Sequence, residues 1–251
     1  MSARLYGIPG SHPSQSAELM LARKGIAFKR LDLIPGAHKA ILRALRFPGT
    51  TVPALKIDGR RLIGTRGISR ALDELQPEPP LFPADPERRR AVEDAERWGD
   101  EEFQSVPRRL AWWAIKKDSS GAREFIAESQ LPLPTGVAVA TIGPVASMAK
   151  RYNGASDEQV RADLAELPAK LDRIDALIAE GVLGGEELNA ADFQIATSVA
   201  LLDCFEDLRP WLDGRAARDL GRRVVPASAG SFPKLFPADW LAAGSPAVAS
   251  R

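Results

Sequence analysis

The strongest constraint on the fold is a proline at the start of an expected strand, in the motif Thr51-Val52-Pro53-Ala54-Leu55. Proline lacks an N–H, so a sheet tolerates it at a strand entrance but not in the middle of a strand. A Val-Pro bond can also be held in the cis form where a turn must be very tight. The motif therefore predicts a sharp turn at which Val52 exposes both of its main-chain hydrogen-bonding groups.

Two neighbouring stretches place this turn in a small domain of strands and helices. Residues 5–14 read as a strand that turns into a helix, about forty residues before Pro53. The pair Asp58-Gly59 follows the motif and suits a tight hairpin between antiparallel strands. The expected order is strand, helix, strand, helix, strand, strand, helix. The helices are predicted from Pro13 or Ser14 to Gly25 and over 38–45 and 67–75, and the later strands over 28–33, 54–57 and 61–63.

This arrangement resembles the thioredoxin-like domain of the cytosolic glutathione transferases, with an opening turn similar to that of the bacterial serine and cysteine classes. Residues 51–55 together with Asp58-Gly59 match strongly, and the other motifs match in part. In that family the Val-Pro bond is cis, and the residue before the proline pairs with the cysteinyl backbone of glutathione. The resemblance implies an α+β thioredoxin-like N-terminal domain, an all-α C-terminal domain and a homodimer.

The domain boundaries are expected at a proline-rich segment. We predict a thiol-binding domain over residues 1–76, a linker over 77–85 and an all-helical domain over 86–251. Hydrophobic periodicity predicts helices from Pro86 to about Trp113 with a kink or break at Pro107, from about 123 into the 140s with interruptions, and over 157–180, after Asn189, and over 211–223. The first aromatic residues of the tail after 224 are expected to be docked, and the end near Arg251 to be flexible.

The pair Asn189 and Asp192 predicts the start of a buried helix. The amide of Asn189 and the acid three residues later can both satisfy free N–H groups at a helix N-terminus. The residues that follow are apolar on nearly every side, which is typical of a central helix. Glutathione transferases have Ser or Thr with Asp at this place, so the resemblance implies a structural role for the pair.

Composition narrows the functional classes. Lys and Arg number 34 and Asp and Glu 33, so the net charge of +1 does not favour nucleic acid or an anionic membrane as a partner. The first residues lack the apolar core of a signal peptide and no run is long enough for a membrane span, so we expect a cytoplasmic protein. A single cysteine, Cys204, and two histidines predict no disulfide and no metal site, and Cys204 is interpreted as a buried small side chain.

Ser11 is the candidate catalytic residue. A thiol becomes a strong nucleophile only as the thiolate, which a hydrogen-bond donor and a helix N-terminus stabilise. The resemblance places Ser11 and Ser14 on the two cysteines of the glutaredoxin motif, so thiol–disulfide exchange by this chain's own cysteines is not expected. The open alternative is that Ser11 or Ser14 only caps the helix. Ser14 and Tyr6 are the other candidate donors.

Gly64 and Thr65 stand where the family has Glu-Ser to hold the γ-glutamyl end of glutathione. Thr65 keeps a hydroxyl and an N–H at a helix N-terminus, which suits a carboxylate. Gly64 lacks the acid, which is expected to weaken the binding of a γ-glutamyl ammonium by roughly 1–3 kcal/mol. The thiol-binding residues are thus predicted as Val52, Pro53, Gly64 and Thr65. Arg66 is either a further cation for the ligand or a surface arginine.

The second substrate of this family is usually an apolar electrophile bound between the domains. Candidate wall residues are His12, Phe103, Trp112 and Trp113, although a tryptophan pair is also typical of a core or an interface. Because arginine outnumbers lysine and alanine is frequent, a GC-rich genome is indicated, and some such bacteria use thiols other than glutathione.

The function predicted from the resemblance is a glutathione S-transferase-like enzyme of detoxification. It would transfer glutathione or a related low-molecular-weight thiol to a small apolar electrophile. One alternative is a non-catalytic thiol-binding or interaction module with the same fold, which the missing acid at Gly64 favours. The other is an oxidoreductase that depends on an external thiol, such as a dehalogenase or a peroxidase.

Overall fold

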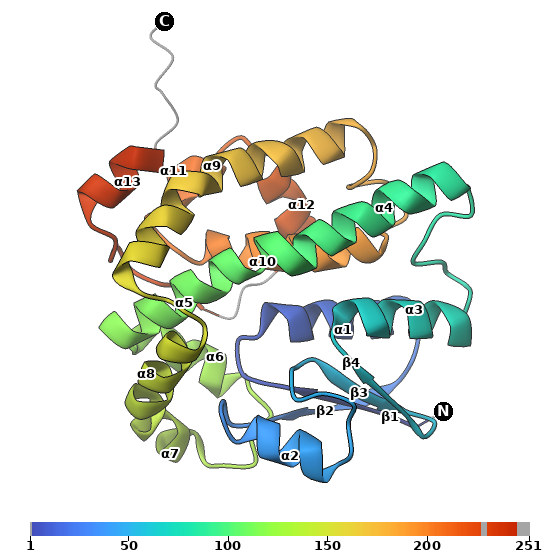
Figure 1. Cartoon of the computed structure of the whole chain (residues 1–251), viewed down its shortest axis with the longest axis horizontal. Coiled ribbons are helices and arrows are strands. Elements are labelled where there is room, and N and C mark those ends of the chain that lie inside the picture. The colour runs from blue at the N-terminus through green and yellow to red at the C-terminus, as the bar shows by residue number, and fades with distance from the viewer. Residues whose placement is uncertain (1, 227–229, 245–251) are drawn as a thin grey trace, which may run out of the picture.

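The first part of the chain is a four-stranded mixed sheet with helices on both faces (Figure 1). The computed structural model describes residues 2–226 and 230–244. Strand β1 pairs in parallel with β2 and antiparallel with β3, giving the order β2-β1-β3-β4. The elements are β1 (Ala3–Gly7), α1 (His12–Arg23), β2 (Phe28–Asp32), α2 (His38–Ala44), β3 (Ala54–Ile57), β4 (Arg60–Ile63) and α3 (Thr65–Leu75). The predicted order of elements is confirmed.

Successive side chains of β1 point to opposite faces of the sheet, and different helices cover these two faces. Leu5 belongs to the large core that α1 and α3 share with the helical domain, whereas Tyr6 belongs to a smaller cluster with Leu42 of α2. Tyr6 is almost fully buried, and its ring meets that of Phe47 edge to face at 5.5 Å between centroids. Tyr6 is therefore a packing residue, and α2 lies on the sheet face turned away from the other helices (Figure 1).

The turn before β3 has the predicted form, because the Val52–Pro53 bond is cis. The hairpin between β3 and β4 turns at Asp58 and Gly59, whose φ angles are 44° and 84°. Such positive values are what a two-residue hairpin turn requires. At the far end of the hairpin the Gly64 N–H donates to the Pro53 carbonyl at 2.9 Å. This bond holds the start of α3 beside the cis turn.

The segment between α3 and the next helix is held by a buried lysine. Lys24, at the end of α1, donates to Asp73 at 2.7 Å and to the carbonyls of Pro77 and Pro79 at 3.1 and 2.6 Å. The bond between Glu78 and Pro79 is a second cis peptide, which the sequence analysis does not foresee. The prolines of this segment lack N–H groups, so the segment has few donors of its own. The lysine supplies donors to its carbonyls and so holds the linker against the N-terminal domain.

The remainder of the described chain is helical; much of it lies on the α1 and α3 side of the sheet, and part of it extends beside the sheet toward α2 (Figure 1). Helix α10 runs through the middle of this second domain and packs on α1, α4 and α12. The other helices surround it or extend beside the sheet. The bounds are α4 (Pro86–Trp98), η1 (Gly99–Phe103), α5 (Ser105–Lys117), α6 (Ser120–Ala127), α7 (Thr135–Ala140), α8 (Ile142–Tyr152), α9 (Asp157–Ala179), α10 (Ala190–Asp203), α11 (Arg209–Leu212), α12 (Ala216–Val224) and α13 (Ala238–Gly244). The predicted fold class is confirmed.

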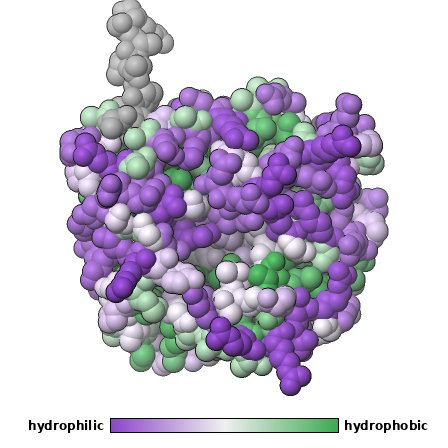
Figure 2. Space-filling view, viewed as in Figure 1, coloured by the Kyte–Doolittle hydropathy of each residue, from purple (hydrophilic) through white to green (hydrophobic). Residues whose placement is uncertain are grey.

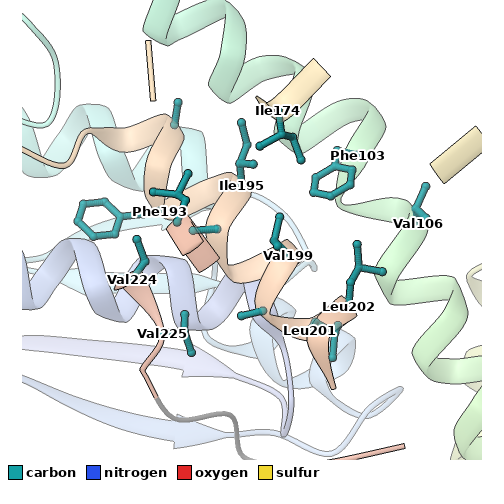
Figure 3. Close-up of a cluster of buried hydrophobic side chains, with 14 of the residues drawn as sticks. Phe103, Val106, Ile174, Phe193, Ile195, Val199, Leu201, Leu202, Val224 and Val225 are labelled. Carbon is teal, nitrogen blue, oxygen red and sulfur yellow. The ribbon is translucent and has the colours of Figure 1, made fainter. Parts of the chain in front are cut away.

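Helix α10 begins at the predicted cap. The side chain of Asn189 accepts from the N–H of Asp192 at 3.2 Å, and Asp192 accepts from the N–H of Asn189 at 2.8 Å. Asp192 also accepts from the N–H of Gly184 at 2.7 Å. Every residue from 190 to 202 is buried. Figure 3 shows α10 side chains pointing toward several surrounding elements, as a central helix requires.

Three predicted helices differ from the structure. The helix expected over 67–75 begins at Thr65. The long helix expected to break at Pro107 is interrupted earlier by the π-helix η1, while Pro107 sits in the first turn of α5, where a proline costs no hydrogen bond. The helix expected over 211–223 is two helices, because the chain turns at Gly214 with a φ of 73°.

The tail returns to the helical domain through its aromatic residues. Phe232 stacks on Phe205 with 4.5 Å between ring centroids, and Phe236 stacks on Trp113 at 5.2 Å. The N–H of Phe232 donates to the Cys204 carbonyl at 2.8 Å, and Cys204 itself is buried as predicted. The docked start of the tail is confirmed, and its predicted flexible end lies outside the described residues. In the described ranges the helices are all too short or too polar to cross a bilayer.

Candidate functional site

A cleft of about 630 Å³ lies between the sheet domain and the helical domain. One side consists of the loop after β1, the cis turn before β3 and the start of α3. The other side consists of η1, α5, α6, α7 and α8, with contributions from α10 and the tail. The predicted residues Ser11, His12, Val52, Pro53, Gly64, Thr65 and Trp112 all line it. The structure therefore brings together residues that the sequence scatters over a hundred positions.

Ser11 is the N-cap of α1 and lines the cleft. Its hydroxyl oxygen accepts from the N–H of Ser14 at 3.3 Å and from the Ser14 hydroxyl at 2.9 Å. Both contacts use lone pairs of the Ser11 oxygen, so its own proton stays available to a ligand. Ser14 is fully buried and is not a wall residue. One hydroxyl can thus both cap the helix and face the cleft, and that hydroxyl is Ser11.

The loop that carries Ser11 lies close to the helical domain. Gly10 has a φ of 66°, and a side chain there would meet the ring of Phe125 at 3.2 Å. Farther along the sheet edge, the Gln130 N–H donates to the Asp32 carboxylate at 2.8 Å, and the Asp32 N–H donates to the Gln130 carbonyl at 3.2 Å. These contacts fix the segment after α6 against the sheet domain, so the two sides of the cleft are held at a set distance.

Val52 presents its main chain to the cleft. Within the described ranges neither its N–H nor its carbonyl has a hydrogen-bond partner in the protein. A buried or half-buried main-chain group without a partner is uncommon, and each one indicates a place for water or a ligand. The cis bond to Pro53 directs the chain away immediately afterwards. Val52 therefore offers one donor and one acceptor side by side.

Thr65 is the first residue of α3 and is almost completely buried. Its hydroxyl oxygen is a buried polar atom without a hydrogen-bond partner. Gly64 before it has φ 75° and ψ 154°, a conformation that residues with a side chain rarely adopt, although an added Cβ would meet open space. The absence of an acid at position 64 thus goes with a backbone that favours glycine. Arg66 lies off the cleft wall and pairs with Glu101 at 2.6 Å.

His12 is buried beside Ser11 and stays neutral. Burial lowers the pKa of His12 to about 3, the charge of Arg108 lowers it further, and a hydrogen bond with the Gln104 backbone opposes the shift. The Nε2 atom of the ring has no partner in the protein. His12 is therefore a neutral ring on the wall that can accept a hydrogen bond, and it is not a source of charge near neutral pH.

The helical side of the cleft has polar residues at a spacing of four: Asp100, Gln104, Arg108 and Trp112. Gln104 donates to the Asp100 carboxylate at 2.6 Å. Burial raises the pKa of Asp100, and burial lowers the pKa of the Arg108 guanidinium. The π-helix η1 carries Asp100, and π-helical turns within helices are frequent at functional sites. This polar row continues onto the aromatic face of Trp112.

Apolar side chains make up most of the rest of the wall. They come from α5, α6, α8 and the tail, and include Ile115, Phe125, Ile126, Ile142, Val145 and Phe232. At the mouth, the Lys39 ammonium lies over the ring of Tyr152 at 3.4 Å, which joins α2 to α8. The exposed apolar residues of α2 and α7 lie near this mouth, and Figure 2 shows green spheres at the lower edge over these helices. In the described ranges no group of three potential metal ligands occurs.

Residues 5–80 match the family model described as the glutathione S-transferase N-terminal domain. The central helix α10 of the second domain packs on α1 and α3. The chain has the glutathione S-transferase fold. A glutathione S-transferase from Rhodospirillum rubrum F11 is 21% identical, with a TM-score of 0.62 over 96% of this chain and 99% of that one.

Two other similar structures carry names other than glutathione S-transferase. FzlA from C. crescentus is 19% identical, with a TM-score of 0.59 over 97% of this chain and 99% of that one. The beta-etherase LigF from Sphingobium sp. strain SYK-6 is 21% identical, with a TM-score of 0.60 over 91% of this chain and all of that one. No curated protein matches the sequence significantly. At these identities the likeness establishes the fold.

Two predicted wall residues of this glutathione S-transferase fold lie in the core instead. Phe103 is fully buried and stacks on Trp98 at 5.4 Å between ring centroids. Trp113 is 2% exposed, and its indole N–H donates to Asp157 at 2.8 Å. Neither residue lines the cleft. Trp112 lines the cleft, whereas Trp113 packs against Phe236 and Trp240 of the tail.

The residues that sequence reasoning missed are those on the helical side of the glutathione S-transferase fold: Asp100, Gln104, Arg108 and Phe125. Asp100, Gln104, Arg108 and Trp112 recur every fourth residue, which is the spacing of one helix face. That signal is present in the sequence, but a polar face on an amphipathic helix usually means solvent. Only the opposing sheet domain makes it the wall of a cleft.

Proposed function

We propose that the cleft binds glutathione or another low-molecular-weight thiol and transfers it to a small electrophile. The observation that carries the proposal is Ser11, whose hydroxyl caps α1 and faces the cleft. It stands on the same wall as the partnerless main chain of Val52. A solved glutathione S-transferase from Methylobacterium radiotolerans, 18% identical with a TM-score of 0.54, is a complex with glutathione sulfonate, which supports this choice of ligand.

The thiol would be held mainly by the sheet domain. The N–H and carbonyl of Val52 would pair with the peptide backbone of the thiol, as two strands pair. The Thr65 hydroxyl and the N-terminus of α3 would hold its carboxylate, which gives the unsatisfied Thr65 oxygen a partner. Asp100 lies on the opposite, helical wall of the cleft, where the charge of Arg66 beside Thr65 acts on it. It would supply the anion that Gly64 lacks for a γ-glutamyl ammonium.

The chemical step depends on a hydrogen-bond donor placed at the sulfur atom of the bound thiol. The Ser11 hydroxyl and the N-terminus of α1 both stabilise negative charge, so the thiol loses its proton to solvent more readily. The thiolate then attacks the electrophilic carbon, forming a carbon–sulfur bond while the leaving group departs with its electron pair. His12 takes no proton in this scheme, because its pKa of about 3 leaves it a weak base.

A thiol-binding module without turnover is the second candidate, and Gly64 is the observation that favours it. Without an acid at that position a γ-glutamyl ammonium depends on Asp100 alone. A thiol-dependent oxidoreductase would also need an external thiol, since Cys204 is buried and not on the cleft wall. The homodimer, the cytoplasmic location and a role in detoxification stay predictions.

The test compares Ser11→Ala with Ser14→Ala. Turnover of an activated aryl chloride with glutathione should fall about 100-fold in Ser11→Ala, as for the loss of one donor to a developing anion. Affinity for glutathione, measured by calorimetry, should change much less. Ser14→Ala removes the buried neighbour of Ser11 but leaves the donor in place, so it should retain most of the turnover.

Each contrary outcome has a clear meaning. Glutathione binding without turnover of any electrophile would support the module. If Ser11→Ala left both turnover and affinity unchanged, Ser11 would have no role in the reaction. A wild-type protein that gives no saturable heat with millimolar glutathione or related thiols would rule out both candidates.

A further inference from the structure

Arg108 is a cation of the cleft wall that has no partner. The side chain is half-buried and lines the cleft. In the part of the chain that the structure describes, its guanidinium makes no hydrogen bond and no ion pair. The next residue shows the usual arrangement, because Arg109 holds both carboxylate oxygens of Asp163 at 2.6 Å.

The charge on Arg108 persists in this position. Burial lowers the pKa of the guanidinium, and the neighbouring Arg109 lowers it further, but an arginine stays protonated in proteins. Asp100 is the anion that acts on it, yet no ion pair joins the two, and Asp100 is bonded to Gln104. His12 on the facing wall is neutral. A half-buried guanidinium without a partner in the protein favours an anionic ligand group here.

The surroundings of Arg108 decide the kind of ligand. Ala111, Trp112 and Ile115 follow it on the same face of α5, and Phe125 lines the cleft as well. Lys39, on the sheet side of the cleft, is engaged with the Tyr152 ring at the mouth. A ligand that fits has one anionic group and an apolar or aromatic body. The fork of a guanidinium matches the two oxygens of a carboxylate.

The carboxylates of the thiol do not account for Arg108. Thr65 and the N-terminus of α3 serve the γ-glutamyl end of that ligand, near the place of Asp100. Arg108 lies eight residues beyond Asp100, which is about 12 Å along a helix. In the direction from Asp100 through Arg108 the wall continues to Trp112 and Ile115, away from α3. The charge of Arg108 also acts on His12, next to Ser11, so the guanidinium lies near the place proposed for the sulfur, where the second substrate must also bind.

We propose that Arg108 makes the cleft selective for electrophiles that carry a carboxylate on an apolar or aromatic body. This inference rests on the proposed function for its catalytic part, since the carboxylate-bearing molecule is the acceptor of the thiol. Its binding part stands without that function. The carboxylate forms a paired contact with the guanidinium, and the body lies against Trp112 and the apolar side chains of α5 and α6.

The first experiment measures binding without any thiol. Calorimetry on the full chain compares 3-phenylpropanoate with its uncharged amide, 3-phenylpropanamide. The wild type should bind the carboxylate roughly 10- to 100-fold more tightly, the range expected for a hydrogen-bonded charged pair. Arg108→Met should lose this preference and Arg108→Lys should retain part of it. Lys116→Met removes a charge from an exposed site on the same helix and should behave as wild type.

The variants also distinguish a role of Arg108 in ligand binding from a role in stabilising the fold. Arg108→Met removes a charge without a partner, so its melting temperature should be equal to that of the wild type or higher. The inference is overturned if the wild type binds neither probe, if it binds both equally, or if Arg108→Met keeps the preference. A preference lost equally in Lys116→Met would show a general effect of charge and would overturn it too.

The second experiment measures turnover with glutathione. Two electrophiles are compared, a chloronitrobenzoate and its methyl ester. In the wild type kcat/KM should favour the carboxylate at least about 10-fold, and Arg108→Met should abolish that ratio. If both electrophiles are turned over and the ratio of their kcat/KM values is the same in the wild type and Arg108→Met, the selectivity is overturned and the transferase function stands. Carboxylate binding without turnover would overturn the transferase function and leave the anion site standing.

Discussion

The two sides of the cleft are made of different parts of the chain. The sheet side uses residues of four segments between positions 8 and 65, and His12, Val52 and Thr65 are among its groups without a partner in the protein. The helical side uses long side chains from residues 100 to 232, such as Arg108, Trp112 and Phe125. The sheet side is thus fixed by the same turns that make the fold. The helical side can change its chemistry while its helices stay in place.

This difference explains how one fold serves several chemistries. Main-chain groups beside a cis proline can pair with the backbone of a peptide-like ligand, whichever side chains surround them. Such a contact suits a thiol ligand that stays the same while the electrophile varies. The opposite wall depends on which residues a helix face presents, and here it presents a cation followed by a tryptophan. The following predictions test which residues of the two sides act on a ligand and which only stabilise the fold.

The largest effect is expected from a pair of neighbouring tryptophans. Trp113→Leu removes a buried ring and the bond to Asp157 and should lower the free energy of unfolding by about 3 kcal/mol, as for large core truncations. Trp112→Leu should change stability by less than about 1 kcal/mol but raise the KM for an aromatic electrophile several-fold. Chemical denaturation and steady-state kinetics on both variants decide this. If Trp112→Leu destabilised the protein and Trp113→Leu raised the KM instead, Trp113 rather than Trp112 would be the wall residue.

The next effect concerns the cap of α10 and its dependence on pH. Burial raises the pKa of Asp192 to about 6, well above its value in an unfolded chain. The folded state then binds more protons than the unfolded state between about pH 4 and 6. Stability should therefore fall by about 2–3 kcal/mol as the pH rises through that window, and stay lower above it.

The variant Asp192→Asn isolates this contribution. It has no titrating group at the cap, so the difference between its unfolding free energy and that of the wild type should change over this pH range. Denaturant unfolding at pH 4, 5, 6 and 7 measures it. A difference that stays constant would mean that Asp192 keeps an ordinary pKa in the folded protein.

A smaller effect is expected at Thr65, where stability and binding should separate. Thr65→Val keeps the shape but removes a buried hydroxyl that has no protein partner. The affinity for glutathione should fall about 10-fold, equivalent to about 1.4 kcal/mol. The free energy of unfolding of the unliganded protein should be unchanged or higher, because no bond is lost. Equal affinity in the two proteins would remove Thr65 from the ligand site.

The smallest effect is expected at His12, which should not titrate near neutral pH. Burial lowers the pKa of His12 to about 3, and burial also lowers the pKa of His38. The chain has two histidines, so nuclear magnetic resonance can follow both ring signals, with His12→Gln to assign them. The His12 signal should stay constant from about pH 5 to pH 8. A midpoint near 6.5 would show a solvated ring and open the site to acid–base chemistry.

The sheet side of the site was predictable because local rules decide it. A proline at a strand entrance, a hairpin pair and a serine before a helix each act over a few residues, and Val52, Pro53 and Ser11 lie on the cleft as expected. The cap of α10 was predictable for the same reason. Position 64 was read as a lost acid, and the structure adds that its backbone suits glycine.

The helical side was predicted less well because distant contacts decide it. The π-helix at Gly99–Phe103 follows from no local signal, and the polar face that leads to Trp112 becomes a cleft wall only through the opposing sheet domain. An added side chain at Gly99 would meet Ile195 at 2.8 Å, so the close approach of α10 constrains this stretch. The short helices from 120 to 152 depend on the sheet domain that they cover, through contacts such as Asp32 with Gln130. Such contacts leave no pattern in either segment alone.

In the proposed reaction, Ser11 and the N-terminus of α1 stabilise the thiolate of a bound thiol. The most direct measurement is a pH titration of the ultraviolet absorbance of the thiolate in the complex with glutathione, for the wild type and Ser11→Ala. We predict that the pKa of the bound thiol lies at least about one unit below the ordinary value near 8.5 in the wild type, and returns toward that value in Ser11→Ala. A bound thiol that stays protonated at neutral pH in the wild type, or an equal pKa in both proteins, would contradict the account.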